Sequence, residues 1–457
     1  MGVRSVCATL GLSALSSATP AHADFQTALG EYNAGHYEVA HAQFLALAEL
    51  GDCSSQFNLG AMALQGQGGP KDAGSGVGWL QAAAGNGCER LVGNRLTVLA
   101  ARLTADEART AAVIVEHYGQ QALRAQGVID PDFNCAGITP PRVVTHPEPE
   151  YPPQLLARRQ DALIITALTI GADGRARDPE VLLAVPQQEY AAAAIEAWLN
   201  ASFAPALRNG QPVEYRLQAK QVFATEGGGS LAVLEPLQRA HAAAEAGDSQ
   251  GQYVFGLAAT LDNSLGVSST SAGAMLMSAA RAGGAQAQYW IGSQLRATAS
   301  CHPHADGTIW LQHAAAGGNG AAEMLLATEL LRDTPAAAQI AQARAALAQA
   351  AQSEDYYVRK HVVALLAASR VDAVRDPHTA VALAQQLLHG DVQSDPHMFV
   401  AVAAAYASSG DFHAAVAQQQ RALQKALTLG WDTHTLTTQL AAYRAGRPWL
   451  GDLFASP

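Results

Sequence analysis

Residues 79–87 read WLQAAAGNG, and residues 310–317 repeat the pattern as WLQHAAAG. A second pattern occurs three times, as QFNLG, QYVFG and QYWIG, at residues 56–60, 252–256 and 288–292. In the second half of the chain, equivalent positions recur every 35 or 36 residues. A period of this length is typical of helical hairpins that stack into a solenoid. We therefore expect a mainly α fold in which each repeat is one hairpin.

The small residues of these patterns predict where the two helices of a hairpin touch. Glycine and alanine leave room for a neighbouring helix to approach closely. The predicted packing positions are Gly60, Ala83, Gly256 and Gly292. A glycine-rich stretch at residues 65–72 separates two of the predicted helices. It lacks the Gly-Lys-Ser/Thr ending of a phosphate-binding loop, so we interpret it as a turn inside one repeat.

These segments resemble SEL-like repeats, which are relatives of the tetratricopeptide repeat. The resemblance is carried by Leu59-Gly60, by the Gly-x-Gly-x-Pro-x-Asp turn at residues 66–72, and by Trp79 with the small residues after it. It implies protein binding on the concave face of a solenoid. The expected spans are SEL-like repeats at 24–125 and 226–354, followed by tetratricopeptide-like repeats at 355–457.

Composition changes at Pro140, where a proline-rich stretch begins. Residues 126–150 are expected to be a proline-rich linker, because proline favours extended backbone. Hydrophobic periodicity then indicates a small α+β domain at residues 151–225. Its expected elements are a helix at 152–159, strands at 163–170 and 180–185 joined by a turn at 172–174, a helix at 188–201, and a last strand at 213–223.

The α+β segment resembles the C-terminal domain of the TonB family. The matching features are Tyr151-Pro152, the ADGR turn at residues 172–175, the helix ending at Trp198, and FAPALRNGQPV at residues 203–213. In that family, the domain binds an extended segment of an outer-membrane transporter beside its last strand. The physical basis is β-augmentation, in which a free strand edge pairs with an incoming peptide.

The last strand is therefore the candidate peptide-binding element. Pro212 lacks an N–H and suits the start of a strand. One set of alternate side chains should face the helix containing Trp198, and the other set should face water, with Arg216 and Lys220 as charges that guard the edge against aggregation. The alternative is that the repeats cover this edge. The predicted peptide-binding residues are Val213, Glu214, Arg216, Gln218, Lys220 and Val222.

Residues 1–23 are typical of a secretory signal peptide. A short apolar stretch ends in Ala21-His22-Ala23, and we expect cleavage after Ala23. The predicted location is the periplasm of a Gram-negative bacterium. The alternative is association with the inner membrane through an uncleaved N-terminus.

Cleavage would leave four cysteines, Cys53, Cys88, Cys135 and Cys301, which is enough for two disulfides in an oxidising compartment. Stacked helices lie roughly 8–10 Å apart, whereas the Cα atoms of a disulfide lie within about 7 Å. A direct bridge between Cys53 and Cys88 is therefore disfavoured. Cys135, in the linker that follows, could reach back to Cys88, and the three possible connectivities stay open.

Several functional classes find no support. The net charge of −11 argues against a nucleic-acid partner. Cys301, His302 and His304 lack a fourth ligand and stand where a repeat turn is expected, which argues against a metal site. The motifs of serine hydrolases, zinc proteases and nucleotide-binding loops are missing. We predict no enzymatic activity, no cofactor and no small-molecule substrate.

The sequence thus predicts a periplasmic protein-interaction scaffold, with helical-hairpin repeats flanking a small TonB-like α+β domain. Its partners would be proteins of the cell envelope, with an outer-membrane transporter as one candidate. Two alternatives stay open. One is a TonB-family component that helps to energise outer-membrane transport, and the other is a regulator of peptidoglycan or other envelope enzymes.

Overall fold

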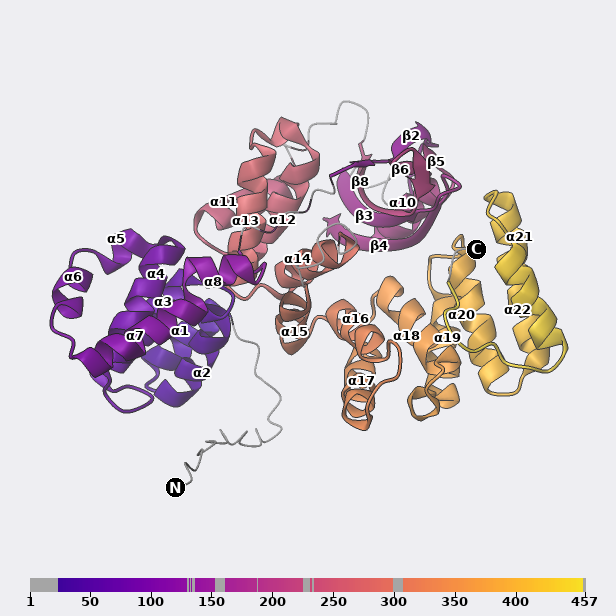
Figure 1. Ribbon diagram of the computed structural model, residues 1–457. Coiled ribbons are helices and arrows are strands. Elements are labelled where there is room, and N and C mark those ends of the chain that lie inside the picture. Colours follow the sequence, from indigo (N-terminus) through magenta and orange to yellow (C-terminus); the bar gives the residue numbers. More distant parts are fainter. Residues whose placement is uncertain are drawn as a thin grey trace, which may run out of the picture.

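The computed structural model of the chain describes residues 24–129, 131, 133, 136–152, 161–186, 188–224, 231, 234–298 and 307–454. Within these residues the chain is mainly helical, and a small α+β region interrupts the helices (Figure 1). The predicted fold class, helical hairpins around a small α+β domain, is confirmed. Among the described helices, none combines the length and the apolar character needed to cross a bilayer.

The first group of helices follows the predicted hairpin pattern. Gly60 on α3 faces α4, and a β-carbon at this position would lie 2.9 Å from Leu80 Cγ. Ala83, near the end of α4, is fully buried. The elements are α1 (Phe25–Asn33), α2 (Tyr37–Ala48), α3 (Cys53–Gln65), α4 (Ala73–Ala83), η1 (Ala84–Cys88), α5 (Glu89–Val92), α6 (Arg95–Ala100), α7 (Ala105–Tyr118) and α8 (Gln120–Ala125).

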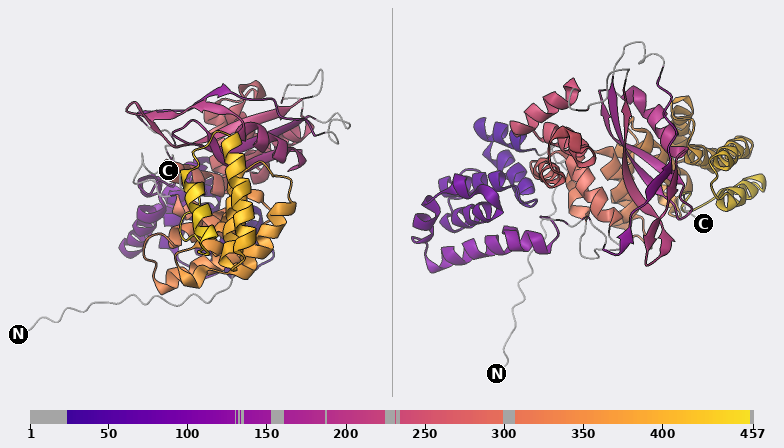
Figure 2. Two further views of the ribbon diagram at one scale, coloured as in Figure 1. Left: turned by 90° about the vertical axis from the view of Figure 1, so that its right-hand side faces the viewer. Right: turned by 90° about the horizontal axis from the view of Figure 1, so that it is seen from above.

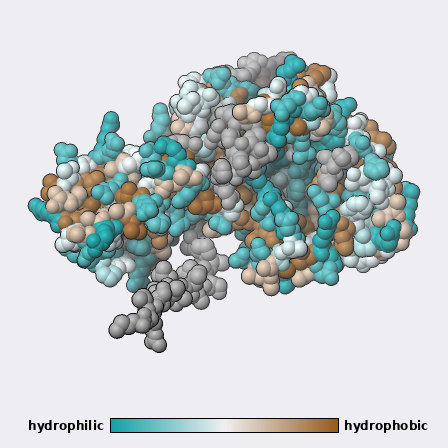
Figure 3. All heavy atoms as spheres, viewed as in Figure 1, coloured by the Kyte–Doolittle hydropathy of each residue, from teal (hydrophilic) through white to brown (hydrophobic). Residues whose placement is uncertain are grey.

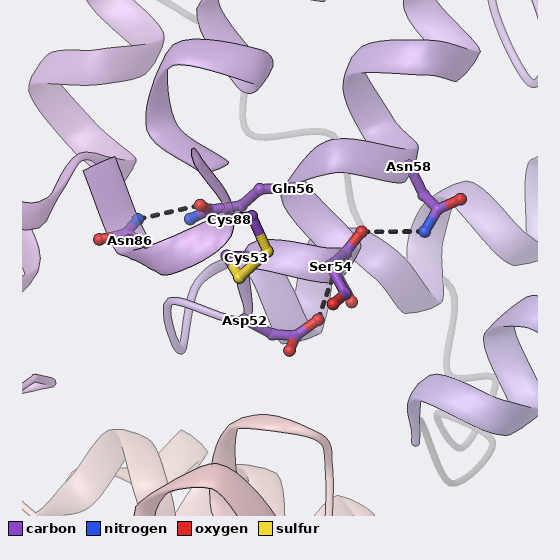
Figure 4. The surroundings of a disulfide bond; sticks show 8 residues. Asp52, Cys53, Ser54, Gln56, Asn58, Asn86 and Cys88 are labelled. Atoms are coloured by element: carbon purple, nitrogen blue, oxygen red, sulfur yellow. Dashed lines mark hydrogen bonds between the residues drawn. A yellow bond between two sulfur atoms is a disulfide. The ribbon is translucent and has the colours of Figure 1, made fainter. Parts of the chain in front are cut away.

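A disulfide joins Cys53 to Cys88, so the prediction against this pairing was wrong (Figure 4). The spacing of helix axes did not apply, because both cysteines stand at helix ends. Cys53 is the first residue of α3, and Cys88 closes η1 directly after α4. Their Cα atoms are 5.6 Å apart. Beside the bridge, Asn86 Nδ2 donates to Gln56 Oε1 at 2.9 Å.

Among its described residues, the α+β region contains three sheets. The main sheet has the order β4-β3-β8, and all of its pairs are antiparallel. The other two have the orders β2-β5 and β1-β6-β7. The strands are β1 (Ile138–Thr139), β2 (Arg142–Thr145), β3 (Ala162–Ile170), β4 (Ala176–Val185), β5 (Ser202–Ala204), β6 (Ala206–Arg208), β7 (Gln211–Val213) and β8 (Tyr215–Phe223).

Helix α10 (Ala191–Leu199), which follows η2 (Gln188–Tyr190), covers one face of the main sheet. Trp198 of α10 shares an apolar cluster with Leu168 of β3 and Ala219 of β8. Tyr190 packs on Phe223 with ring centroids 5.0 Å apart. This layer resembles the predicted one, in which the helix ending near Trp198 lies against the last strand.

The structure differs from the sequence prediction at several boundaries, among them the return strand predicted at 180–185, which begins earlier as β4 (Ala176–Val185). The predicted linker at 126–150 contains β1 and β2, which pair with β6 and β5 and so belong to the α+β region. The predicted last strand begins later, because Val213 belongs to β7 and only residues 215–223 form β8. The helix expected at 152–159 lies almost entirely outside the described residues.

A second group of helices follows the sheets. A β-carbon at Gly256 of α12 would meet the Ala272 carbonyl oxygen of α13 at 3.2 Å. The elements are α11 (Glu235–Glu245), α12 (Ser249–Leu261), η4 (Asn263–Leu265), α13 (Ser269–Arg281), α14 (Ala285–Ala297), α15 (Thr308–Ala316), α16 (Gly320–Leu330), α17 (Ala337–Ala350), α18 (Tyr356–Ala368), η5 (Asp372–Val374), α19 (Pro377–His389), α20 (Pro396–Ser408), α21 (Phe412–Thr428) and α22 (His434–Arg444).

The two groups of helices pack directly against each other. The N–H of Phe25 donates to the Ala282 carbonyl oxygen at 3.0 Å. Leu50 and Ile129 of the first group share one apolar cluster with Leu276 and Trp290 of the second. The α+β region is therefore an insertion into one continuous helical array.

The main sheet rests on the second group of helices. In the left view of Figure 2, the strands form a layer over these helices, and in Figure 1 the helices curve beneath and beside them. Leu163 and Ile165 of β3 belong to the same apolar cluster as Leu257 of α12 and Ile291 of α14. The face of the sheet opposite α10 is thus covered by repeats. On the side of the molecule drawn in Figure 3, hydrophilic and hydrophobic residues are interspersed.

Candidate peptide-binding edge

Strand β8 is a regular edge of the main sheet. It pairs with β3 through an unbroken register, from Ala162 opposite Phe223 to Ile170 opposite Tyr215. It contains no proline. Among the described residues, β8 makes no backbone–backbone hydrogen bond besides its pairing with β3, although the Val222 carbonyl oxygen accepts from Gln221 Nε2 at 3.1 Å. Within the described part of the chain, the outer side of β8 therefore has N–H and C=O groups without a backbone partner, which is what an extended peptide needs.

The opposite edge, β4, is interrupted. Its register against β3 shifts in two places, once beside Leu182 and once beside Asp178. Pro179 lies within β4 and Pro186 follows it, and proline has no N–H to donate. The Leu182 carbonyl oxygen accepts a hydrogen bond from the Tyr253 hydroxyl at 2.9 Å. Bulges and prolines of this kind protect an edge from pairing, which leaves β8 as the suitable edge.

The two faces of β8 meet different surroundings. Leu217 and Ala219 pack toward Trp198, as the alternation predicted. The other face was expected to meet water, and that prediction was wrong. The side chain of Arg216 is only 18% exposed, and Val222 packs against the apolar cluster that includes α12 and α14. The repeats cover this face of the strand, although they leave its backbone edge unpaired among the described residues.

Arg216 belongs to a buried ionic network between the sheet and the repeats. Its guanidinium group lies 2.5 Å from a carboxylate oxygen of Glu180 and 3.7 Å from one of Asp178. The Tyr289 hydroxyl of α14 donates to Glu180 at 2.5 Å. The Arg216 guanidinium also lies 5.5 Å from the ring centroid of Tyr357 on α18. A strand charge that looked solvent-exposed in the sequence is therefore an anchor of the interface.

Lys360 of α18 extends this network although its side chain is fully buried. Its ammonium group lies 2.9 Å from Asp178 on β4 and 2.9 Å from Asp395, the residue before α20. His361 Nε2 lies 2.8 Å from the same Asp178 carboxylate. Burial opposes the ionisation of Asp178, but His361 and Lys360 outweigh it and hold its pKa well below the usual value. Burial raises the pKa of Glu180, which Arg216 and Tyr289 oppose.

Lys220 forms the second link between β8 and the repeats. Its ammonium group lies 2.8 Å from Oδ2 of Asp262, directly after α12. Burial opposes ionisation of Asp262, but the hydrogen bonds from Lys220 and Ser264 lower its pKa. The side chain of Lys220 is 36% exposed and that of Asp262 is 15% exposed. Lys220 is therefore a paired residue, which differs from the free surface charge predicted.

The remaining predicted edge residues lie along the same segment. Val213 of β7 pairs with Ala206 of β6, and Glu214 stands exposed between β7 and β8. Gln218 lies in the middle of β8, opposite Ala167 of β3, and is half-buried.

Other predicted positions fall outside the described residues. These are Ala21 and Ala23 of the expected cleavage site, together with Cys135, Cys301, His302 and His304. Among the residues that are described, no group of three or more histidines, cysteines, aspartates or glutamates could hold a metal ion.

Sequence reasoning missed the residues that join the sheet to the repeats. Tyr289 stands 109 positions from its partner Glu180, and His361 stands 183 positions from Asp178. No local pattern links such pairs. A weak signal was the cluster of polar and aromatic residues at 356–361, YYVRKH, inside an otherwise apolar helix.

Comparison with known proteins identifies the α+β region. Residues 147–225 match the family described as Gram-negative bacterial TonB protein C-terminal, which confirms the predicted TonB C-terminal domain. A crystal structure of a protective antigen of uropathogenic Escherichia coli strains, displaying an SLR fold, is similar at 15% sequence identity and a TM-score of 0.32. That likeness covers 92% of this chain and 86% of that chain. No curated protein matches the chain.

A TonB C-terminal domain set among helical repeats supports a protein-interaction scaffold.

Proposed function

We propose that this protein is a periplasmic scaffold that captures an extended segment of a cell-envelope protein at the outer edge of β8. The observation that carries the proposal is the contrast between the two sheet edges. β8 has an unbroken register without proline, whereas β4 is broken by two register shifts and by Pro179. An extended peptide adds to a sheet by main-chain hydrogen bonds, so it needs a regular edge.

The anchoring of the sheet suits this role. Because Arg216 and Lys220 are both tied into contacts that reach the repeats, β8 has little freedom to move. A strand that is already ordered loses little conformational entropy when a peptide binds.

A proline substitution in β8 tests the proposal. Gln218→Pro removes one N–H from the middle of the strand without emptying the core. We expect the mature variant to keep its melting temperature and to lose the protein that the parent captures from envelope extract, identified by mass spectrometry. Val144→Pro is the matched control. Val144 is 66% exposed on β2 and has no partner in the β2–β5 register.

If Gln218→Pro unfolds the sheet, its N–H faces β3, and Leu217→Pro becomes the variant that tests the outer side. If a folded proline variant still captures the partner protein, the partner binds the repeats and not β8.

Export is a separate part of the proposal. The disulfide between Cys53 and Cys88 supports an oxidising compartment, because structural disulfides are rare in the cytosol. Cleavage after Ala23 would make Asp24 the first residue. Asp24 already caps α1 by accepting a hydrogen bond from the Thr27 N–H at 2.8 Å. N-terminal sequencing of envelope-purified protein should read Asp24, and an intact Met1 in the membrane fraction would overturn the periplasmic reading.

The match to a TonB C-terminal domain also favours a second candidate, a component of energised outer-membrane transport. Capture of an outer-membrane transporter through β8, together with an uncleaved membrane-bound N-terminus, would support it. Capture of a peptidoglycan enzyme by the repeats would instead support a regulatory role.

A further inference from the structure

Helix α12 crosses beneath the main sheet from one edge to the other. Near its start, the Tyr253 hydroxyl donates to the Leu182 carbonyl oxygen of β4. Directly after its end, Asp262 pairs with Lys220 of β8. The order of strands is β4-β3-β8, so the helix spans the full width of the sheet. The turn that follows α12 therefore reaches β8 on the repeat side of the sheet, next to the edge where a peptide would be added.

The accessible member of the pair at this edge is the ammonium group. Both carboxylate oxygens of Asp262 are engaged, because Oδ1 accepts from the Ser264 N–H at 2.9 Å and Oδ2 accepts from Lys220 at 2.8 Å. The ammonium group has three donors, and one of them serves Asp262. The lysine side chain is also the more exposed of the two. Lys220 can thus donate to a further acceptor.

Arg216 cannot play the same part. It lies on the same face of β8, but its guanidinium group already serves Glu180, the Asp178 carbonyl oxygen and the Thr169 hydroxyl. Among the described residues, Asp262 is the only partner of Lys220, so Lys220 is the cation of β8 with both exposure and spare donors.

A peptide strand added beside β8 would place every second side chain on the repeat side. The residue directly opposite Lys220 would have its β-carbon about 4.5–5.5 Å from that of Lys220. We propose that the site is built jointly by the TonB-like sheet and the repeat turn at Asp262, and that it selects an extended peptide with an aspartate or glutamate opposite Lys220. This inference rests on the proposed capture at β8 and adds the chemistry of the captured segment.

The expected selectivity is modest and depends on salt. Cross-strand pairs of opposite charge on a half-exposed surface change affinity by roughly two- to fivefold. Raising the ionic strength should reduce this preference. Asp262 competes with the peptide for the ammonium group. Asp262→Asn should therefore increase the preference for an acidic peptide, while the asparagine oxygen can still accept from Ser264.

The test uses the full mature chain and three fluorescein-labelled peptides. Each has eight residues of alternating valine and threonine, with glutamate, glutamine or lysine replacing a central threonine. Fluorescence anisotropy should give the tightest Kd for glutamate and the weakest for lysine. Lys220→Met should remove the difference. Lys425→Met, on the exposed surface of α21, is the matched control and should keep it.

The experiment distinguishes a failure of capture at β8 from a failure of the role of Lys220. If none of the peptides binds, or if binding survives in the proline variant of β8 that stays folded, capture at β8 is wrong and this inference falls with it. If the peptides bind and a folded proline variant abolishes binding, but Lys220→Met keeps the glutamate preference, capture at β8 stands and the role of Lys220 is overturned.

Discussion

At position 292 the backbone of α14 passes so close to α15 that a β-carbon would lie 2.8 Å from Leu311 Cγ and 3.0 Å from the Gly307 carbonyl oxygen. We expect Gly292→Leu to overpack this contact and to lower the free energy of unfolding by about 1–3 kcal/mol or more. Gly273→Leu is the control, because no atom outside its own helix lies within 4 Å of a β-carbon there. Equal urea midpoints for the two variants would contradict the packing role of Gly292.

Lys360 offers a second test at the scale of one residue. Lys360→Met leaves the carboxylates of Asp178 and Asp395 buried beside an apolar side chain. Removing one member of a buried ion pair costs about 3–5 kcal/mol. We expect a loss of this size at pH 7, measured by urea denaturation. The same substitution at the exposed Lys425 should change stability little.

The loss of stability caused by Lys360→Met should depend on pH in a defined direction. Burial opposes the ionisation of Asp178 and Asp395, yet nearby positive groups, Lys360 among them, keep both pKa values below the usual range. Each group therefore contributes stability that is present above the ordinary aspartate pKa and is lost as the pH falls through its value in the folded protein. Without Lys360 these carboxyl groups protonate more readily. The difference between parent and variant should narrow as the pH falls below about 4.

Among the elements, the hairpin of α3 and α4 is closed by the disulfide between Cys53 and Cys88. The sequence separation of 35 residues predicts a contribution of about 3–4 kcal/mol from the restricted unfolded chain. Cys53→Ser and Cys88→Ser should each lower stability by this amount. The double variant should lose no more than either single variant, because one bond is removed in each case. Additive losses in thermal melting would contradict the pairing.

Strand β8 shows what a strand pattern can and cannot predict. The apolar alternation at Leu217 and Ala219 located the face that meets α10. The same pattern assigned Arg216 to water, since a polar face usually meets solvent. Its real surroundings include Tyr357, which lies on a distant repeat helix. The ends of helices and strands were harder to predict than their faces. The placement of Val213 and the Cys53–Cys88 bridge both depend on how the ends of separate elements meet in space.

For the whole molecule, the hairpin motifs and the TonB-like motif are local in the sequence and were therefore predictable. The packing of the sheet on the repeats could not be predicted, because it depends on contacts between residues far apart in the sequence, such as Asp178 with His361. The prediction that the concave face of the repeats binds a protein stays a prediction. The sheet itself occupies the surface offered by α12, α14 and α18.

The shared core leads to a prediction for the isolated α+β region. Leu163, Ile165 and Leu183 pack with helices α12 to α14 and would meet water if the region were excised. We expect a fragment of residues 136–233 to lack a cooperative thermal transition, because it exposes one whole face of the sheet. A sharp transition in the fragment, matched by native-like near-ultraviolet circular dichroism, would show that the domain is autonomous.

The direct packing of the first helices on α13 and α14 bears on how the chain is synthesised. Leu50 and Ile129 leave the ribosome long before Leu276 and Trp290, which belong to the same apolar cluster. Until those later residues emerge, the N-terminal hairpins carry an uncovered apolar side, and such surfaces promote association with other chains. Closure of the array also requires contacts across a long sequence separation, which slows folding. Holding chaperones would therefore be most useful to this protein during that interval.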